Sequence, residues 1–541
     1  MQDEISLSRL DYAFSRFLTQ KSVLEAKKAK QFRSIIAQLS NALSQGDSCI
    51  EINKEEQSIV LASGMADNSG KFPVVLESNK LYLQRYWSYE CQLANKIAAL
   101  TATEHSIEDV DKIIDQYFPV KDEVDWQKEA AIRAVNDTFT IITGGPGTGK
   151  TTTVVKILVL LQELSVQSLN IALAAPTGKA AMRLQESIGQ NIASLPGSKI
   201  IKNAIPEQVI TLHRLLGARP PSPYFKYNSD NPLPYDIVVV DEVSMIDLPL
   251  MSKLVNALKK GTRLILLGDK DQLASVETGT VLADLTTALP EYTQELKKSY
   301  RFSGHIKTFA DDVNQQREQD AWELLTQNHA QVCLLKDNLI EYIVNKQTTY
   351  LQLISDGAEF NSCFDAFNAF QVLCATRQGV NSVADINLRV TLKLKERKLI
   401  QSSGLWYSGR PVMVTHNDPV LRLYNGDIGI CMPDAENGGQ LMVFFLLPDS
   451  TIRKYMPARL PHCETVFAMT IHKSQGSEFN EVLLVLPESI NPVLTKELIY
   501  TGITRAKESL KLLTSKAVFL ETIQRRVDRY SGLAERIKKI A

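Results

Sequence analysis

The pattern of apolar and polar positions divides the chain into an N-terminal region and a longer region of alternating strands and helices. Residues 13–43 and 83–100 have helical periodicity, and the mixed segment 51–76 between them predicts strands. No glycine-rich loop or other catalytic pattern occurs in the first 118 residues. We therefore expect a helical and mixed N-terminal domain, residues 1–118, that carries no chemistry of its own.

From Trp126 onward, short β-branched runs alternate with helical segments. This alternation predicts parallel sheets with crossover helices. The first set of runs is FTIIT (the 138–143 region), NIALAAP (170–176), DIVVVDE (236–242) and RLILLGD (263–269). The second set is QVLCAT (371–376), EVLLVLP (481–487) and SLKLLTS (509–515). We expect one α/β domain at 119–295 and a second built from 296–403 and 464–541.

Residues 404–463 have a different pattern, which interrupts the second α/β domain. GRPVMVTHND, NGDIGICM, QLMVFFLL and TIRKYMP alternate like short antiparallel strands, and Asn425-Gly426-Asp427 is a hairpin signal. We expect a small inserted β-barrel here. The predicted fold class is α/β, with two parallel-sheet domains, the N-terminal domain and this insertion.

Composition narrows the class of protein. A chain of 541 residues is too long for one core, so three or four domains are expected. The start has no signal-peptide pattern, and no run approaches the ~18 apolar residues of a membrane span, so we expect a cytoplasmic protein without a membrane segment. Seven cysteines without a C-x-x-C pair argue against a zinc or iron–sulfur site. The net charge of −1 does not decide whether nucleic acid binds.

A glycine-rich segment after the first strand run predicts a phosphate-binding loop. It reads G-x-x-x-x-G-K-T between the strand FTIIT and a helix, the context that this motif requires. Backbone N–H groups and the helix N-terminus would hold phosphate, Lys150 would reach the β- and γ-phosphates, and the Thr151 hydroxyl would bind Mg²⁺. ATP and Mg²⁺ are therefore the expected cofactors. The expected nucleotide-binding residues in this segment are Gly144, Gly145, Pro146, Gly147, Thr148, Gly149, Lys150, Thr151 and Thr152.

Two acidic residues end the strand run DIVVV. We expect Asp241 to hold Mg²⁺ and Glu242 to orient or deprotonate the attacking water. Two acids at a strand end are more often a solvated turn or a helix cap. Their position after a phosphate loop and a second strand favours the ATPase interpretation.

Four later motifs add candidates around the nucleotide. Gln272 follows the strand run RLILLGD and can lie beside the γ-phosphate, although a polar loop is the alternative. Tyr300 could stack on adenine and Arg301 could bind phosphate, or they could be a surface pair. Gly476 lies in the hydroxyl-rich string HKSQGSEF, and Arg505 follows on a helical segment. An arginine that reaches the γ-phosphate from a facing domain makes hydrolysis depend on cleft closure.

The ordered motifs resemble those of superfamily 1 helicases, and among these the RecD-like branch that includes exodeoxyribonuclease V alpha subunits. The resemblance covers about three-quarters of the chain, from Trp126 to the C-terminus. It implies two RecA-like motor domains and an SH3-like inserted barrel. The strings that carry it are ITGGPGTGKTTTV, APTGKAAMRL, TLHRLLG, VVVDEVSMIDLPLM, LGDKDQLASVETG, YRF, IHKSQGSEF and YTGITRAK.

The resemblance also implies roles that spacing alone does not. Gln127 matches the glutamine that reads adenine, and translocation would run 5′ to 3′. A small hairpin is expected at about 217–235. Each of the matched DNA-contacting positions could instead be a helix cap or a packed polar group. The expected single-stranded DNA contacts are Thr177, His213, Thr470 and His472.

Two further strings, LYLQRYWSYE (81–90) and RRVDRYSGLAERI (525–537), resemble the alpha subunit of the RecBCD complex. This implies RecB-like and RecC-like partners in a heterotrimer, docking through the N-terminal domain, and action on single-stranded and duplex-end DNA in break repair and recombination. No second acidic and histidine cluster suggests a nuclease site, so cleavage would belong to a partner. The alternatives are a standalone RecD-like or RNA-directed helicase, and a nucleotide-dependent assembly switch that moves no strand.

Overall fold

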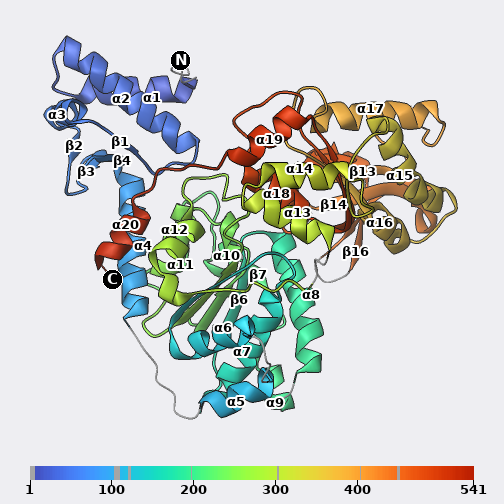
Figure 1. Ribbon diagram of the computed structural model, residues 1–541, viewed down its shortest axis with the longest axis horizontal. Helices are drawn as coiled ribbons and strands as arrows, with labels where there is room; N and C mark the ends of the chain where they lie inside the picture. The colour runs from blue at the N-terminus through green and yellow to red at the C-terminus, as the bar shows by residue number, and fades with distance from the viewer. Residues whose placement is uncertain are drawn as a thin grey trace.

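The computed structural model describes residues 7–102, 110–119, 124–195, 198–300, 304–401, 404–418, 420–447 and 451–540. Within these ranges four sheets organise the chain (Figure 1). Two are wholly parallel, as the alternating strand and helix pattern predicts. None of the described helices is long and apolar enough to cross a membrane.

The N-terminal region has its own core and is partly different from the expectation. The helical stretch expected at 13–43 is two packed helices, α1 (Arg9–Lys21) and α2 (Ala26–Ser44). The strands expected throughout 51–76 are wrong for α3 (Lys54–Ala62), because Asn53 and Glu56 form a capping box that starts a helix there. The sheet has the order β1-β4-β3-β2, with strands Cys49–Glu51, Lys80–Leu83, Val74–Glu77 and Ala66–Asp67.

The first parallel sheet has helices on both faces. Neighbouring residues point to opposite faces, so Ile142 packs with α6 (Trp126–Asn136), α7 (Lys150–Leu164) and α8 (Gly178–Ser194), while Ile141 packs on the other side. That other side is covered by α11 (Leu248–Asn256) and α12 (Val281–Ala288). The strand order is β10-β5-β9-β8-β6-β7, with bounds Thr293–Glu295, Phe139–Thr143, Arg263–Gly268, Ile237–Val240, Ile171–Ala175 and Ile210–Thr211.

Two helices from the ends of the sequence complete this second face. Helix α4 (Gln84–Thr101) packs against α11, and its Leu93 and Ile97 are fully buried in the same core. The last helix, α20 (Leu533–Ile540), lies along α4 and α12 (Figure 1). The expected second motor domain extends to residue 541, whereas this helix packs beside the first sheet.

The second parallel sheet is packed with two groups of helices. Helices α13 (His305–Asn314), α14 (Glu318–Thr326), α18 (Lys496–Ile503) and α19 (Lys516–Gln524) form one packed group. Helices α15 (Leu339–Ser355), α16 (Phe360–Asn368) and α17 (Val383–Glu396) form another. The order is β11-β20-β19-β12-β18, with bounds Val332–Leu334, Ala506–Leu513, Phe479–Val485, Phe370–Cys374 and Ala468–Thr470.

Two insertions interrupt the parallel sheets. The insertion in the second parallel domain is an antiparallel sheet with the strand order β16-β15-β14-β13-β17. The described residues contain no ladder that joins β16 to β17, so strand pairing does not close the expected barrel. The hairpin expected at 217–235 contains an antiparallel bridge between Ala218 and Phe225. The strands of the inserted sheet are Ile452–Tyr455, Gln440–Leu446, Ile428–Asp434, Arg410–Val414 and Cys463–Thr465.

Candidate functional site

The phosphate loop lies where the sequence predicts it, between β5 and α7. The loop begins with Gly144, whose N–H donates to Gly268 O at 3.2 Å, so it is fixed to the end of β9. Lys150 Nζ donates to Gly144 O at 2.6 Å and to Gly145 O at 3.1 Å. The ammonium group therefore points into the loop, where it can exchange these carbonyl bonds for phosphate oxygens.

Gln127 and Tyr300 flank the same loop. Gln127 Nε2 donates to Thr148 O at 3.3 Å, and Tyr300 N donates to Gly147 O at 2.8 Å. A Cβ at Gly149, whose φ is +84°, would lie 2.3 Å from Gln127 Nε2 and 3.9 Å from Tyr300 Cδ2. The positive φ favours glycine here, and a larger residue would also displace the Gln127 amide. Gln127, Thr148 and Tyr300 line a hollow of about 120 Å³, together with Trp126 and Leu296.

The acidic pair follows β8 directly. Glu242 has φ +52°, a left-handed conformation that is strained by about 1–3 kcal/mol for a residue other than glycine. Its N–H donates to Asp241 Oδ1 at 2.8 Å. Burial raises the pKa of Asp241 to about 6; the Glu242 carboxylate adds to this rise, and Lys150 opposes it. A bound cation would stabilise the ionised form of such a carboxylate.

A further carboxylate, that of the buried Asp269, was not among the residues predicted from the sequence. It ends β9 as Asp241 ends β8, and this repeated position was the available signal. Its Oδ2 accepts from Gln272 Nε2 at 3.1 Å and from Tyr500 Oη at 3.1 Å. Burial raises the pKa of Asp269 to about 6, although Lys150 lowers it.

Gln272 and Arg505 connect the two halves of the site. Arg505 Nη2 donates to Gln272 Oε1 at 2.8 Å, and its Nε donates to Thr501 O at 3.1 Å. The arginine is only 2% exposed; burial lowers its pKa, and the nearby Glu242 and Asp269 carboxylates oppose that effect. The first sheet supplies Gln272, whereas the second supplies Arg505, so the contact crosses the cleft.

Most of the predicted nucleotide-binding residues line one cavity of about 690 Å³. Gly145 and Thr148 line an adjoining cavity of about 430 Å³ instead. Arg301 lies outside the described residues. The predicted residues that line the larger cavity are Gln127, Pro146, Gly147, Gly149, Lys150, Thr151, Thr152, Asp241, Glu242, Gln272, Tyr300 and Arg505.

The cavity also contains an ion pair that the sequence did not single out. Arg183 of α8 pairs with Glu478, which comes from the second sheet and has a side chain 8% exposed. Arg183 lies in the string APTGKAAMRL, but no spacing rule assigns it to the nucleotide. The pair is a further polar connection across the cleft.

The residues present fit a magnesium ion. The Thr151 hydroxyl and the buried Asp241 carboxylate line one cavity, and Mg²⁺ prefers such oxygen donors together with phosphate and water. The raised pKa of Asp241 marks a buried carboxylate that a cation would stabilise. We therefore assign these two side chains as candidate metal ligands.

The four expected DNA contacts lie on several elements. Thr177 caps α8 and accepts from Ala180 N at 3.2 Å, and Thr470 ends β18 and accepts from Lys473 N at 3.3 Å. His472 is half-buried, and burial together with the charge of Arg529 lowers its pKa.

The remaining two predicted residues have packing contacts. His213 stacks edge-on against Phe225 of the hairpin, with ring centres 5.8 Å apart. Gly476 lies off the nucleotide cavity; its φ of +73° favours glycine, and a Cβ there would make ordinary contact with Ala180 of the first motor domain, 3.4 Å from its N atom.

Comparisons with known proteins agree with this geometry. Residues 127–278 match the AAA domain family, and residues 465–513 match the UvrD-like helicase C-terminal domain family. The RecBCD enzyme subunit RecD of Haemophilus influenzae is 36% identical, over 86% of this chain and 82% of its own. The subunit of the same name from Mycolicibacterium smegmatis is 37% identical, over 87% of this chain and 84% of its own. The ATP-dependent RecD2 DNA helicase of Deinococcus radiodurans is 31% identical, over 74% of this chain and 50% of its own.

Proposed function

Because the chain belongs to the RecD family of RecBCD enzyme subunits, we propose that it is the ATP-dependent 5′-to-3′ DNA helicase subunit of a RecBCD-type exodeoxyribonuclease V. The observation that carries the proposal is the hydrogen bond between Arg505 and Gln272 across the cleft that contains Lys150. A motor needs nucleotide contacts from both domains, because only then does hydrolysis depend on their closure.

The described residues support a division of labour in ATP hydrolysis. Lys150 neutralises charge on the β- and γ-phosphates, and Gln272 together with Arg505 contacts the γ-phosphate from both sides of the cleft. Glu242 orients the attacking water and accepts its proton. Thr151 and Asp241 would hold Mg²⁺, which would supply positive charge against the developing phosphate charge. Arg301 is a second phosphate ligand in this proposal.

Adenine would bind between Gln127 and Tyr300, beside Gly149. The glutamine amide offers both a donor and an acceptor to the base edge, and the tyrosine ring offers a stacking surface. The amide already reaches Thr148 O, so base recognition and the phosphate loop are linked by one side chain.

The DNA strand would cross the edge where Thr177, His213, Thr470 and His472 lie. We propose the division into 1–118, 119–295, 296–403 with 464–541, and 404–463, with two changes. The second motor domain ends at about Gln524 because α20 packs on α4, and α4 belongs with the first motor domain because it packs on α11. The insertion would be an SH3-like module. The Asn425-Gly426-Asp427 turn of the insertion lies against α8, which Thr177 caps, since a Cβ at Gly426 would lie 3.6 Å from Lys179 Cε.

The expected partners are RecB-like and RecC-like subunits, with nuclease activity in a partner, in the cytoplasm. The test is to purify the chain from its native cells with whatever co-purifies, and to measure ATP hydrolysis without nucleic acid, with single-stranded DNA and with RNA. Strong stimulation by DNA and two co-purifying chains support the proposal. Stimulation by RNA alone, a chain that purifies by itself, or nucleotide-controlled assembly without hydrolysis would each replace it with one of the alternatives.

A further inference from the structure

The segment after α19 leaves the second motor sheet and crosses to the first. It begins on the second sheet's side, where Arg525 Nη1 donates to Asn491 O at 2.9 Å and Val527 N donates to Glu497 Oε2 at 3.1 Å. Two residues later its contacts are with the first motor domain and the N-terminal region. We call residues 525–532 the strap.

Arg529 is the point at which the strap meets the first motor domain. Its Nη1 donates to three carbonyl groups of one loop, those of Ser275 at 2.8 Å, Glu277 at 3.1 Å and Gly279 at 3.3 Å. The guanidinium also lies against Gly46, where a Cβ would be 2.3 Å from Arg529 Cζ. One side chain therefore organises the loop and contacts the N-terminal region.

The same loop begins at the nucleotide cleft. Leu273, the neighbour of Gln272, donates its N–H to Thr501 Oγ1 at 2.9 Å and accepts at its carbonyl from Gln475 Nε2 at 3.3 Å. At the other end Gly279 N donates to Gly46 O at 2.8 Å. The seven residues 273–279 thus connect the Gln272–Arg505 contact to the N-terminal region, with Arg529 holding the middle and the far end.

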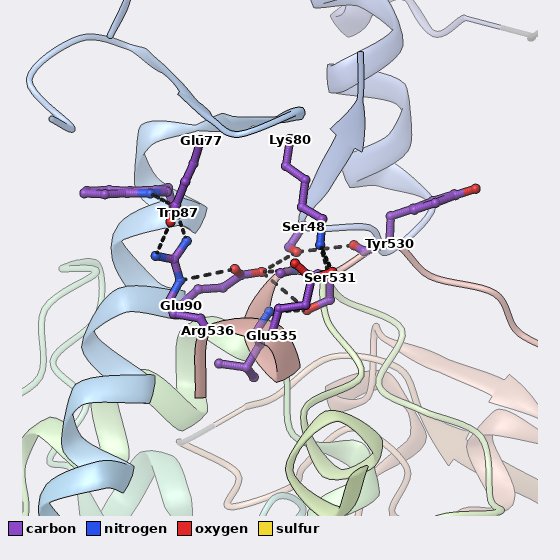
Figure 2. Close-up of polar contacts among 11 residues, drawn as sticks. Ser48, Glu77, Lys80, Trp87, Glu90, Tyr530, Ser531, Glu535 and Arg536 are labelled. Carbon is purple, nitrogen blue, oxygen red and sulfur yellow. Dashed lines mark hydrogen bonds and ion pairs between the residues drawn. The ribbon is translucent and has the colours of Figure 1, made fainter. Parts of the chain in front are cut away.

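The strap is also anchored beyond Arg529, around the fully buried Glu90 of α4 (Figure 2). The Glu90 carboxylate accepts from Ser48 Oγ at 2.6 Å and from Gly532 N at 3.2 Å. Just after the strap, Arg536 pairs with Glu77 at 2.5 Å. The Glu90 contacts after Arg529, together with those of Arg525 and Val527 before it, fix the strap on both sides, so Arg529 has little freedom to move away from the loop.

We infer that Arg529 is a positioning residue for ATP hydrolysis, which acts by holding the loop 273–279 so that Gln272 meets Arg505 in the closed cleft. This inference rests on the proposed function and deepens it. It makes the N-terminal region, through Gly46, an element that controls turnover. A shift of that region would move the loop and loosen the γ-phosphate contacts without altering the phosphate loop.

The test compares Arg529→Ala with Arg526→Ala in the purified assembly. Arg526 lies on the same strap, but its Nε donates to Gln316 Oε1 at 2.6 Å in the second motor domain and it makes no described bond to the loop. We expect Arg529→Ala to lower kcat for DNA-stimulated ATP hydrolysis about tenfold with KM for ATP within about twofold. Arg526→Ala should match wild type, and Arg529→Lys should recover part of the loss because an ammonium group can also donate to the carbonyls.

A double variant separates positioning from general destabilisation. If Arg529 acts through Gln272, adding Arg529→Ala to Gln272→Ala should slow turnover no further. Should Arg529→Ala not fold, Arg529→Met keeps the side-chain stem and carries the same comparison. Unchanged kcat in a folded Arg529 variant, or fully additive losses in the double variant, would overturn the inference alone. A wild-type assembly that hydrolyses no ATP would overturn the proposed function and this inference with it.

Discussion

Arg505 Nη2 donates a hydrogen bond of 2.8 Å to Gln272 Oε1, and this bond joins the second motor sheet to the first. Both side chains are almost completely buried, at 2% and 6% exposure. A buried charged donor and an amide acceptor hold each other only while the cleft is closed. The contact therefore links the position of the two sheets to the site of hydrolysis.

Arg505→Ala should leave nucleotide affinity within a modest factor and lower turnover by several orders of magnitude, because an arginine supplied across the cleft can be worth about 10³–10⁵ in rate. Nucleotide binding and single-turnover hydrolysis, measured on one preparation, check this. Arg301→Ala is expected to behave in the same way. Weaker ATP binding with unchanged turnover at saturation would make these arginines ground-state ligands and would contradict cleft-closure control.

Glu242→Gln should bind ATP and DNA but hydrolyse very slowly, because the amide cannot accept the proton of the attacking water. The variant is nearly isosteric, so the strained backbone at this position is kept. The measurement is retention of a labelled single strand in the presence of ATP, next to the hydrolysis rate. Loss of ATP binding would mean that the roles of Asp241 and Glu242 are exchanged.

The pH dependence of Mg²⁺ activation should come from Asp241, because burial raises the pKa of this carboxyl group to about 6. A carboxylate binds Mg²⁺ in its ionised form, so the metal must compete with a proton below about pH 6. The Mg²⁺ concentration for half-maximal hydrolysis should be flat above pH 7 and rise about tenfold per unit below pH 6. A half-saturating concentration that stays constant between pH 5 and 7 would remove Asp241 from the metal site.

Two N-terminal truncations should behave differently. Removing residues 1–110 also removes α4, whose Leu93 and Ile97 are buried in the first motor core, at a cost of about 1.5–3 kcal/mol for each such side chain. That truncation should lose folding and hydrolysis together. Removing residues 1–80 keeps α4 and should leave hydrolysis measurable while partner chains no longer co-purify. A stable, active motor without residues 1–110 would contradict the packing argument, and retained assembly would move the docking surface to the motor domains.

The sequence predicted the parts whose signals are local. The phosphate loop, the strand ends that present Asp241 and Glu242, and the alternation of strands and helices are each written in a few neighbouring residues. Gln272 and Arg505 are 233 positions apart in the chain, yet each was found from its own motif. Their direct contact is a property of the domain arrangement, which no local pattern contains.

The remaining features depend on long-range packing. The periodicity of 83–100 indicated a helix with one apolar face but not that this face packs on α11. Likewise, α20 packs on α4 through Leu533 and Ile537, which are buried in the first motor core, and its Arg536 lies 3.8 Å from the buried Glu90 carboxylate. The helix at α3 had a local signal, the Asn53 and Glu56 capping box, which the expectation of strands overlooked.

Unwinding of tailed duplexes tests the central claim most directly. The assembly should separate, with ATP, a duplex that has a 5′ single-stranded tail when only this subunit is active, and Lys150→Gln should abolish that activity. Lys156→Gln is the matched control and should unwind normally. Lys156 lies on the same helix but points away from the cleft, where its Nζ donates to Tyr117 O at 2.8 Å. Unwinding of the 5′-tailed substrate that survives Lys150→Gln, or ATP hydrolysis by the wild type without any strand separation, would contradict the account.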